Sequence, residues 1–308
     1  MSTGIGLILI CCLFWATDTV FRLPLLAILS AAQISVFEHF FGTISSFPLA
    51  LKDASNFSRL GRRGWIAAIY VGVVASGIGT LCFTEAYRYL SPSVVIILLK
   101  TQPFVVVLLA RVFLKETFPK SFYVLLLLGV VLSAFASGVI DTSSPFEMAQ
   151  GANLKGVLLA CTAAATWGSS SVVSKYLTKT LNPYQLTLVR YGFGFLFLSA
   201  VVFFELLTHF TSIWAAVGSI WDGLRGDSII RLFYIGFVPG TIGTAFYYAG
   251  LRRVPASVAA VCELFFPTFA VVINWYFLDE QLTQSQIVAA LLLGITILFL
   301  QKSLKSKH

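Results

Sequence analysis

Two charged side chains, Lys100 and Glu263, lie inside the apolar runs 92–114 and 256–278. If these runs are helices entering a bilayer from opposite sides, a rise of ~1.5 Å per residue puts Lys100 about 12 Å and Glu263 about 10 Å from the entry surface. Both then lie near the middle of a ~30 Å hydrocarbon core, with depths that differ by ~8 Å. An ammonium attracts a carboxylate, and a carboxylate attracts an amine or another cationic centre. The pair therefore predicts a binding site for a zwitterion resembling an α-amino acid.

Two other interpretations of this pair remain open. Lys100 and Glu263 could form a direct structural ion pair without a ligand, and breaking it would leave a buried charge alone. Glu263 could instead be a carboxylate that couples transport to protons. An ionisable group inside the membrane is a functional candidate in each case.

A second set of charges lies nearer the ends of the apolar runs. Asp18 and Arg22 have the i, i+4 spacing of a local helix ion pair. Glu38 and Arg190 carry opposite charges at positions that an internal repeat makes equivalent, as shown below. We expect them to act as a gate between the repeats or as a second substrate contact, with a purely structural role as the alternative.

Aromatic side chains could bind the rest of such a substrate, because indole faces attract cations and stack on planar rings. The candidates are Trp15, Trp167, Phe83, Tyr247 and Phe266. Packing in the protein core is the alternative for each of them.

Two prolines, Pro103 and Pro267, fall in the middle of apolar runs. A proline there removes a helix hydrogen bond, so we expect kinks that free backbone carbonyls for bending or ligand contact.

The composition defines the surroundings of these residues. Of the 308 residues, 58% are hydrophobic and 11% charged, and the mean hydropathy is +0.89, whereas about a quarter of a soluble domain is charged. An ordinary soluble protein is excluded, and a lipid bilayer is the expected partner. The net charge of +8 is carried largely in short loops, so we expect no nucleic-acid partner. The 5 cysteines and 3 histidines show no metal-ligand spacing, so we expect no bound metal and no enzymatic activity.

The apolar runs predict an all-α membrane protein of ten transmembrane helices, because they are longer and more continuous than barrel strands. The expected spans are 4–23, 34–51, 65–87, 92–114, 121–140, 154–176, 185–207, 229–248, 256–278 and 285–301. With both termini in the cytoplasm, fourteen of the 21 Lys and Arg residues lie inside and five outside, and Lys100 and Arg190 lie within spans. We therefore expect both termini to be cytoplasmic.

An internal repeat divides these spans into two sets of five, at 1–140 and 154–308. An offset of 152 residues aligns Trp15 with Trp167 and Glu38 with Arg190, and a later offset of 164 aligns Pro103 with Pro267. The longer loop 208–228 accounts for the change in offset. Because five is odd, the second repeat enters the membrane from the opposite side. Inverted repeats of this kind are typical of secondary transporters that work by alternating access.

Several short motifs resemble the EamA repeats of the drug/metabolite transporter superfamily, and the resemblance covers nearly the whole chain. They are Thr166–Ser170, Leu188–Tyr191, Pro103 and Pro267, Leu114–Glu116 and Leu278–Glu280. The resemblance implies a central cavity lined by spans 1–4 and 6–9, transport of a small metabolite and no nucleotide cofactor. This chain has Glu38 where the family often has Arg, which puts the family's usual ligand chemistry in doubt.

The leading hypothesis is a secondary transporter for a small zwitterionic metabolite with an aromatic or cationic part. This chemistry resembles that of the S-adenosylmethionine transporters of obligate intracellular bacteria, which implies S-adenosylmethionine as substrate, in exchange for S-adenosylhomocysteine. The alternatives are a proton-coupled amino-acid or drug exporter and, from another class, a lipid scramblase or structural membrane bundle. The expected location is a bacterial inner membrane, and the expected state is a monomer.

Overall fold

The structure is a computed structural model of the chain. It describes residues 2–90, 92–136, 153–209, 226–278 and 283–305, together with residues 218, 221 and 224. Every regular element in this part of the chain is helical, with no strand. This agrees with the all-α prediction. A backbone segment in lipid must satisfy its own hydrogen bonds, and a helix does so within one segment.

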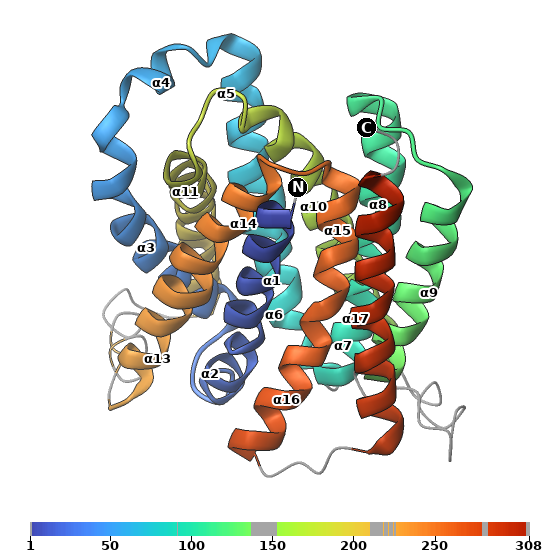
Figure 1. The fold of residues 1–308 in the computed structure, drawn as a ribbon. Coiled ribbons are helices and arrows are strands. Elements are labelled where there is room, and N and C mark those ends of the chain that lie inside the picture. The colour runs from blue at the N-terminus through green and yellow to red at the C-terminus, as the bar shows by residue number, and fades with distance from the viewer. Residues whose placement is uncertain are drawn as a thin grey trace.

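The first half of the chain, up to residue 136, forms a series of helices with short connections (Figure 1). In order they are α1 (Ser2–Ala16), α2 (Asp18–Leu25), α3 (Ala31–Ala50), η1 (Leu51–Asp53), α4 (Ser55–Ser58), α5 (Gly61–Tyr70), η2 (Val71–Ile78), α6 (Gly79–Ala86), α7 (Pro92–Leu99), α8 (Gln102–Leu109), η3 (Ala110–Leu114) and α9 (Lys120–Ala136). Ser30 begins α3 with a capping box, accepting from the Gln33 N–H while the Gln33 side chain accepts from the Ser30 N–H.

The second half, from residue 153, repeats much of this order. Its helices are α10 (Leu154–Leu177), α11 (Pro183–His209), α13 (Ser228–Ile235), η5 (Gly236–Gly243), α14 (Thr244–Leu251), α15 (Ala256–Cys262), η6 (Glu263–Phe265), α16 (Phe266–Leu278) and α17 (Gln284–Lys305). The π-helical segments η2 and η5 correspond to within one residue at the 164-residue offset, and each ends inside an Ile-Gly-Thr motif.

Several of the expected spans are interrupted helices. The first breaks at Thr17, whose hydroxyl donates to the Phe14 carbonyl at 2.7 Å. The fourth breaks between Leu99 and Gln102, directly before Pro103. The ninth passes through the 3₁₀ turn η6 before Pro267. A proline cannot donate the helix hydrogen bond to the residue four places earlier, so the chain changes helix type near Pro103 in the fourth span and near Pro267 in the ninth.

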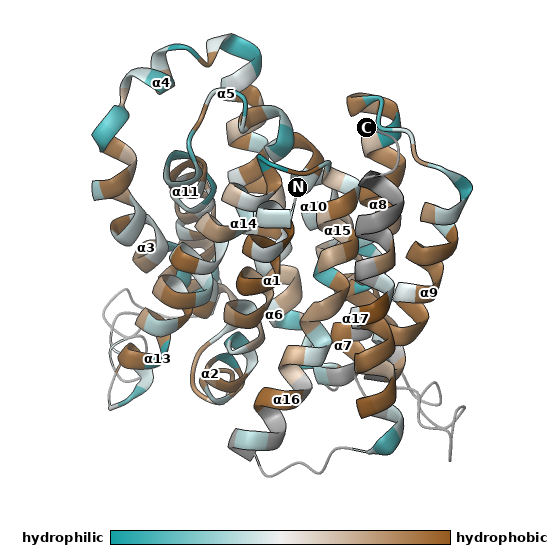
Figure 2. Cartoon of the chain, in the orientation of Figure 1, coloured by the Kyte–Doolittle hydropathy of each residue, from teal (hydrophilic) through white to brown (hydrophobic). Residues whose placement is uncertain are grey.

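Hydrophobic residues make up most of the length of many of the helices (Figure 2). Six helical stretches in the described residues are long and apolar enough to cross a membrane, and four further apolar helices have 10–17 residues. Large side chains such as Leu154, Phe113 and Tyr276 are more than 70% exposed. Such a surface fits a multi-pass protein surrounded by lipid.

Contacts between the two halves form the centre of the bundle. Helix α3 packs along α11, α1 packs on α14, and α10 packs on α6. A Cβ built on Gly79 would lie 2.6 Å from Trp167 Nε1, and one built on Gly243 would lie 3.4 Å from Trp15 Cδ1. The glycine of each Ile-Gly-Thr motif therefore gives room to the tryptophan of the other half.

The start of α1 and the end of α17 lie at the same end of the bundle (Figure 1). We call this the terminal end. The turn between α14 and α15 also lies there, whereas α16 runs to the opposite end.

Candidate functional site

A cavity lined by residues of both halves lies between them. All nine residues predicted from the sequence as substrate contacts line it, as does Pro103, whereas Pro267 is not part of its wall. The lining predicted residues are Trp15, Glu38, Phe83, Lys100, Trp167, Arg190, Tyr247, Glu263 and Phe266. Ligand sites are typically concave pockets with a few polar groups on an apolar wall.

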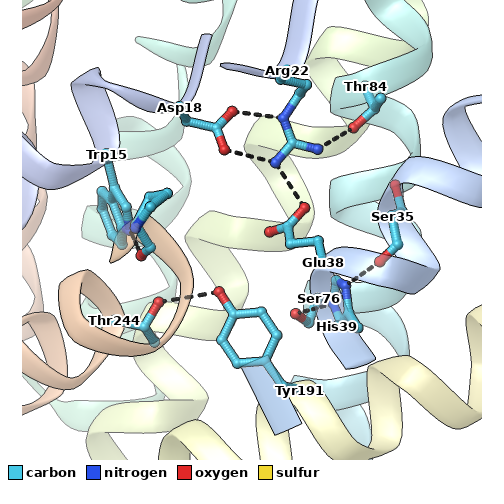
Figure 3. Close-up of polar contacts among 11 residues, drawn as sticks. Trp15, Asp18, Arg22, Ser35, Glu38, His39, Ser76, Thr84, Tyr191 and Thr244 are labelled. Atoms are coloured by element: carbon cyan, nitrogen blue, oxygen red, sulfur yellow. Dashed lines mark hydrogen bonds and ion pairs between the residues drawn. The ribbon is translucent and has the colours of Figure 1, made fainter. Parts of the chain in front are cut away.

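A network of buried charges forms one wall of the cavity (Figure 3). Arg22, only 2% exposed, donates from Nε and Nη2 to the two oxygens of Asp18 at 2.6 and 2.8 Å. Its Nη2 also reaches Glu38 Oε2 at 2.7 Å, and Nη1 donates to Thr84 Oγ1 at 2.9 Å. The predicted local pair of Asp18 and Arg22 therefore forms, and it extends to α3 and α6.

Glu38 is paired with Arg22 rather than with Arg190, its repeat counterpart. Arg190 donates from Nη1 to the Tyr248 hydroxyl at 3.5 Å, and its buried Nε has no hydrogen-bond partner among the described residues. Within the described part of the chain, no carboxylate lies within 4.0 Å of the Arg190 guanidinium. Glu38 and Arg190 therefore form no ion pair with each other, and their role as a gate or as substrate contacts stays a prediction.

His39 anchors the helix that carries Glu38 (Figure 3). Its Nδ1 is 2.8 Å from the Ser35 carbonyl, which can only accept, so Nδ1 carries a proton. In the neutral ring, Nε2 then accepts from the Ser76 hydroxyl at 2.8 Å. The ring also packs on Tyr191, with centroids 5.0 Å apart. These contacts fix α3 against η2 and α11 behind the cavity wall.

Lys100 and Glu263 meet at the breaks of two helices, but their charged groups do not form an ion pair with each other. Lys100 Nζ donates to the backbone carbonyl of Glu263 at 3.4 Å and lies 4.7 Å from the centre of the Phe266 ring. This carbonyl is the one to which Pro267, four residues later, cannot donate. Backbone and ring thus stabilise the ammonium, and its charge remains uncompensated by a carboxylate within 4.0 Å in the described residues.

The Glu263 carboxylate is held by a residue that the sequence did not single out. Gln102 Nε2 donates to Glu263 Oε2 at 2.8 Å, whereas Oε1 is buried without a hydrogen-bond partner in the described part. Gln102 stands at the start of α8, beside the helix break at Lys100 and Thr101. In the sequence, Gln102 could have been singled out because it directly precedes Pro103, where a helix break is expected.

Two aromatic pairs join the halves across the cavity. Trp15 packs against Tyr247 with ring centres 5.3 Å apart, and Trp167 packs against Phe83 at 5.1 Å. Each pair combines one residue from either half, and the 152 and 164 offsets make the two pairs equivalent. Trp15 Nε1 donates to the Pro239 carbonyl at 3.1 Å, but Trp167 Nε1 is buried without a partner among the described residues.

Further polar and small residues complete the wall. Tyr247 donates from its hydroxyl to Ser171 Oγ at 2.7 Å, and Tyr191 and Thr244 share a longer contact of 3.4 Å (Figure 3). The lining residues that sequence reasoning did not name as contacts are Asp18, Thr19, Arg22, Thr80, Leu99, Gln102, Ser170, Ser171, Tyr191, Pro239, Gly240, Thr244 and Leu264. Their polar members could bind hydroxyl, carbonyl and N–H groups of a ligand. The part of the chain that the structure describes contains no group of three His, Cys, Asp or Glu residues able to hold a metal.

The apolar helices and the polar cavity between two similar halves define a multi-pass membrane protein built to bind a small molecule within the bilayer. Residues 2–138 and 154–301 each match the model of the EamA-like transporter family. The chain belongs to this family.

Two known proteins are similar along nearly the whole chain. The riboflavin transporter ImpX of Fusobacterium nucleatum subsp. nucleatum is 27% identical over 309 residues. The aligned region covers 96% of this chain and 97% of that transporter. A solved structure described only as "Crystal structure of protein" has a TM-score of 0.75, 14% identity and 96% coverage of both chains. The second likeness concerns the fold alone. The family and the relative are transporters, which indicates that this protein is not an enzyme.

Proposed function

We propose that the protein is a secondary transporter that moves a flat, polar heteroaromatic metabolite through the central cavity, with riboflavin as the first candidate. The observation that carries this proposal is the pair of equivalent aromatic contacts, Trp15 with Tyr247 and Trp167 with Phe83, on the wall of one cavity. Indole faces stack on planar ring systems. The name of the relative from Fusobacterium directs the choice to a flavin.

The polar groups of the cavity suit the edges of an isoalloxazine ring and a ribityl chain. Lys100 and Arg190 can donate to ring carbonyls, and Glu263 can accept from a ring N–H or a hydroxyl. The lining contains three acidic residues (Asp18, Glu38, Glu263) and three basic ones (Arg22, Lys100, Arg190), so its formal charge is zero. A neutral ligand such as riboflavin enters without adding net charge to the membrane interior.

S-adenosylmethionine is the second candidate. It is favoured by the separation of charge at Lys100 and Glu263, which contact each other only through a backbone carbonyl and could hold a carboxylate and a cationic centre. Its adenine could stack on the tryptophans. Its overall charge of one positive unit suits a formally neutral cavity less well than a neutral flavin does.

Binding distinguishes the two candidates. Riboflavin fluorescence should fall when the ring stacks on indole, so titration of purified protein gives its affinity. We expect Trp15→Leu and Trp167→Leu each to weaken binding about 2- to 10-fold, corresponding to ~0.5–1.5 kcal/mol per aromatic contact. Trp221→Leu, at a 67% exposed position that does not line the cavity, is the matched control. No change in riboflavin fluorescence, together with a rise in the melting temperature of the protein on addition of S-adenosylmethionine, would instead favour the second candidate.

The transport scheme uses the two repeats, 1–140 and 154–308, as inverted five-helix units. In this scheme ten spans place both termini in the cytoplasm of a bacterial cell, and the repeats rock about the cavity in alternating access. Exchange and proton coupling can be separated in proteoliposomes. Uptake stimulated by an internal substrate analogue, such as S-adenosylhomocysteine for S-adenosylmethionine, without a pH gradient supports exchange. Strict dependence on the gradient supports a proton-coupled exporter with Glu263 as the coupling group.

A further inference from the structure

Glu116 connects the two halves of the chain at the terminal end. It follows η3 and accepts three hydrogen bonds from the start of α15. Its Oε1 accepts from the Ala256 N–H at 2.8 Å, and Oε2 accepts from the Ser257 N–H at 3.1 Å and the Ser257 hydroxyl at 2.8 Å. Hydrogen bonds to a carboxylate are stronger than those between neutral groups.

The backbone before Glu116 is bent to make this contact. Lys115 has a φ of 57°, in the left-handed region, and is the only non-glycine residue with positive φ in the described part of the chain. The turn is closed by the Glu116 N–H, which donates to the Ala110 carbonyl at 3.2 Å. A side chain in this region is strained, and such residues persist where the surrounding contacts hold them.

Lys175 holds the same turn from the other side. Its Nζ donates to the carbonyls of Leu251 at 2.7 Å and Val254 at 2.8 Å, where α14 ends. A cation is stabilised at a helix C-terminus by the unpaired carbonyls there. The turn between α14 and α15 is therefore hydrogen-bonded on one side to the Glu116 carboxylate of the first half and on the other to the Lys175 ammonium of the second half.

The helices packed at the terminal end differ from their counterparts at the opposite end. All seven residues of α15 are 0% exposed, and α15 packs on α8. The 164-residue offset makes α7 the counterpart of α15 and α16 the counterpart of α8 and η3. In the described residues α7 packs on α10 and α16 packs on α1, but α7 and α16 do not pack on each other as α15 packs on α8. One helix contact is thus made at the terminal end, and its symmetric mate is open.

We propose that Glu116 is a positioning residue for transport: its bonds to Ala256 and Ser257 keep α15 on α8 and hold the terminal end closed, so that the cavity opens toward the opposite end. This inference rests on the proposed transport function. Release of Glu116 is the step that lets α15 separate from α8 and gives the substrate access to the terminal end. The state with the terminal end open is then the less populated one for the free protein.

Cysteine labelling in sealed vesicles tests the role of Glu116 without a known substrate. One probe, Ala259→Cys, lies at a 0% exposed position in α15, and another, Thr80→Cys, lies on the cavity wall. A membrane-impermeant maleimide is added from the terminal side for the first probe and from the opposite side for the second. The chain without a probe supplies the background from the native cysteines. With Glu116→Ala, we expect the maleimide to label Ala259→Cys about tenfold faster, because hydrogen bonds to a charged group are lost. The labelling rate of Thr80→Cys should fall.

Two further variants make the result decisive. Glu116→Gln keeps one acceptor oxygen without the charge and should give an intermediate labelling rate. Asp53→Ala removes an exposed carboxylate that accepts hydrogen bonds from its neighbours Ser55 and Asn56, and should leave both rates unchanged. Unchanged rates in Glu116→Ala, or faster labelling of both probes as in general loosening, would overturn the inference. Absence of flavin binding with the predicted labelling pattern would contradict the proposed substrate alone.

Discussion

Arg22 Nη2 lies 2.7 Å from Glu38 Oε2, and this ion pair joins α2 to α3 at the cavity wall. The same guanidinium binds Asp18 through two bonds, so one buried cation serves two carboxylates. Glu38 is thereby held away from Arg190, its repeat counterpart. Arg190 and Lys100 are left as cations that a substrate can contact.

Arg22→Ala should destabilise the protein strongly. It leaves Asp18 and Glu38 buried and close together without a cation, and breaking a buried pair typically costs ~3–5 kcal/mol. Arg231→Ala is the control, because Arg231 and Asp227 form an exposed i, i+4 pair at 2.6 Å that should contribute ~0–1 kcal/mol. Chemical unfolding in detergent measures both free energies. Equal losses in the two variants would mean that the buried network is not stabilising.

Lys100→Met should separate stability from binding. Lys100 has no carboxylate within 4.0 Å in the described part, so its buried charge opposes folding, and an apolar side chain of similar length removes this cost. We expect an unchanged or higher melting temperature together with weaker flavin binding. A lower melting temperature with unchanged affinity would identify Lys100 as a purely structural residue.

The glycines of the two Ile-Gly-Thr motifs should respond differently to alanine. In Gly79→Ala the new Cβ would lie 2.6 Å from Trp167 Nε1, and overpacking of this kind costs ~1–3 kcal/mol. In Gly243→Ala the nearest atoms of Phe14 and Trp15 are 3.3 and 3.4 Å away, so the cost should be smaller. Melting temperature and flavin affinity of the two variants check this order, and the reverse order would contradict the described packing.

Tyr247 should act mainly through its ring. Tyr247→Phe removes the hydroxyl that donates to Ser171 but keeps the ring against Trp15, so flavin affinity should change less than about 3-fold. Tyr247→Ala removes the ring and should weaken binding about 10-fold. Fluorescence titration compares the two. A larger loss in Tyr247→Phe than in Tyr247→Ala would show that the hydroxyl, and not the ring, is the important group.

The sequence predicts which residues gather at the centre of the bundle better than it predicts their partners. The repeat offsets and the apolar runs single out Trp15, Trp167, Lys100 and Glu263, and all four line the cavity. The position of a residue along a helix follows from counting residues. Helical character and the two-repeat family follow from the same runs and motifs.

The partner of each charge could not be predicted, because it depends on how each helix is rotated about its axis. The sequence made Glu38 equivalent to Arg190, whereas packing turns Glu38 toward Arg22. Pro103 and Pro267 are equivalent in sequence, but only Pro103 is among the lining residues. Gln102 carries no charge and stands beside a helix break, and its bond to Glu263 became visible only when α8 and η6 were placed together.

Counterflow in proteoliposomes tests the central claim most directly. Vesicles with the purified protein are loaded with unlabelled riboflavin, and the entry of labelled riboflavin is followed. The account predicts protein-dependent entry that unlabelled flavin suppresses and that the Trp15→Leu, Trp167→Leu double variant reduces strongly. Entry no faster than into protein-free vesicles, for riboflavin and S-adenosylmethionine alike, would contradict it.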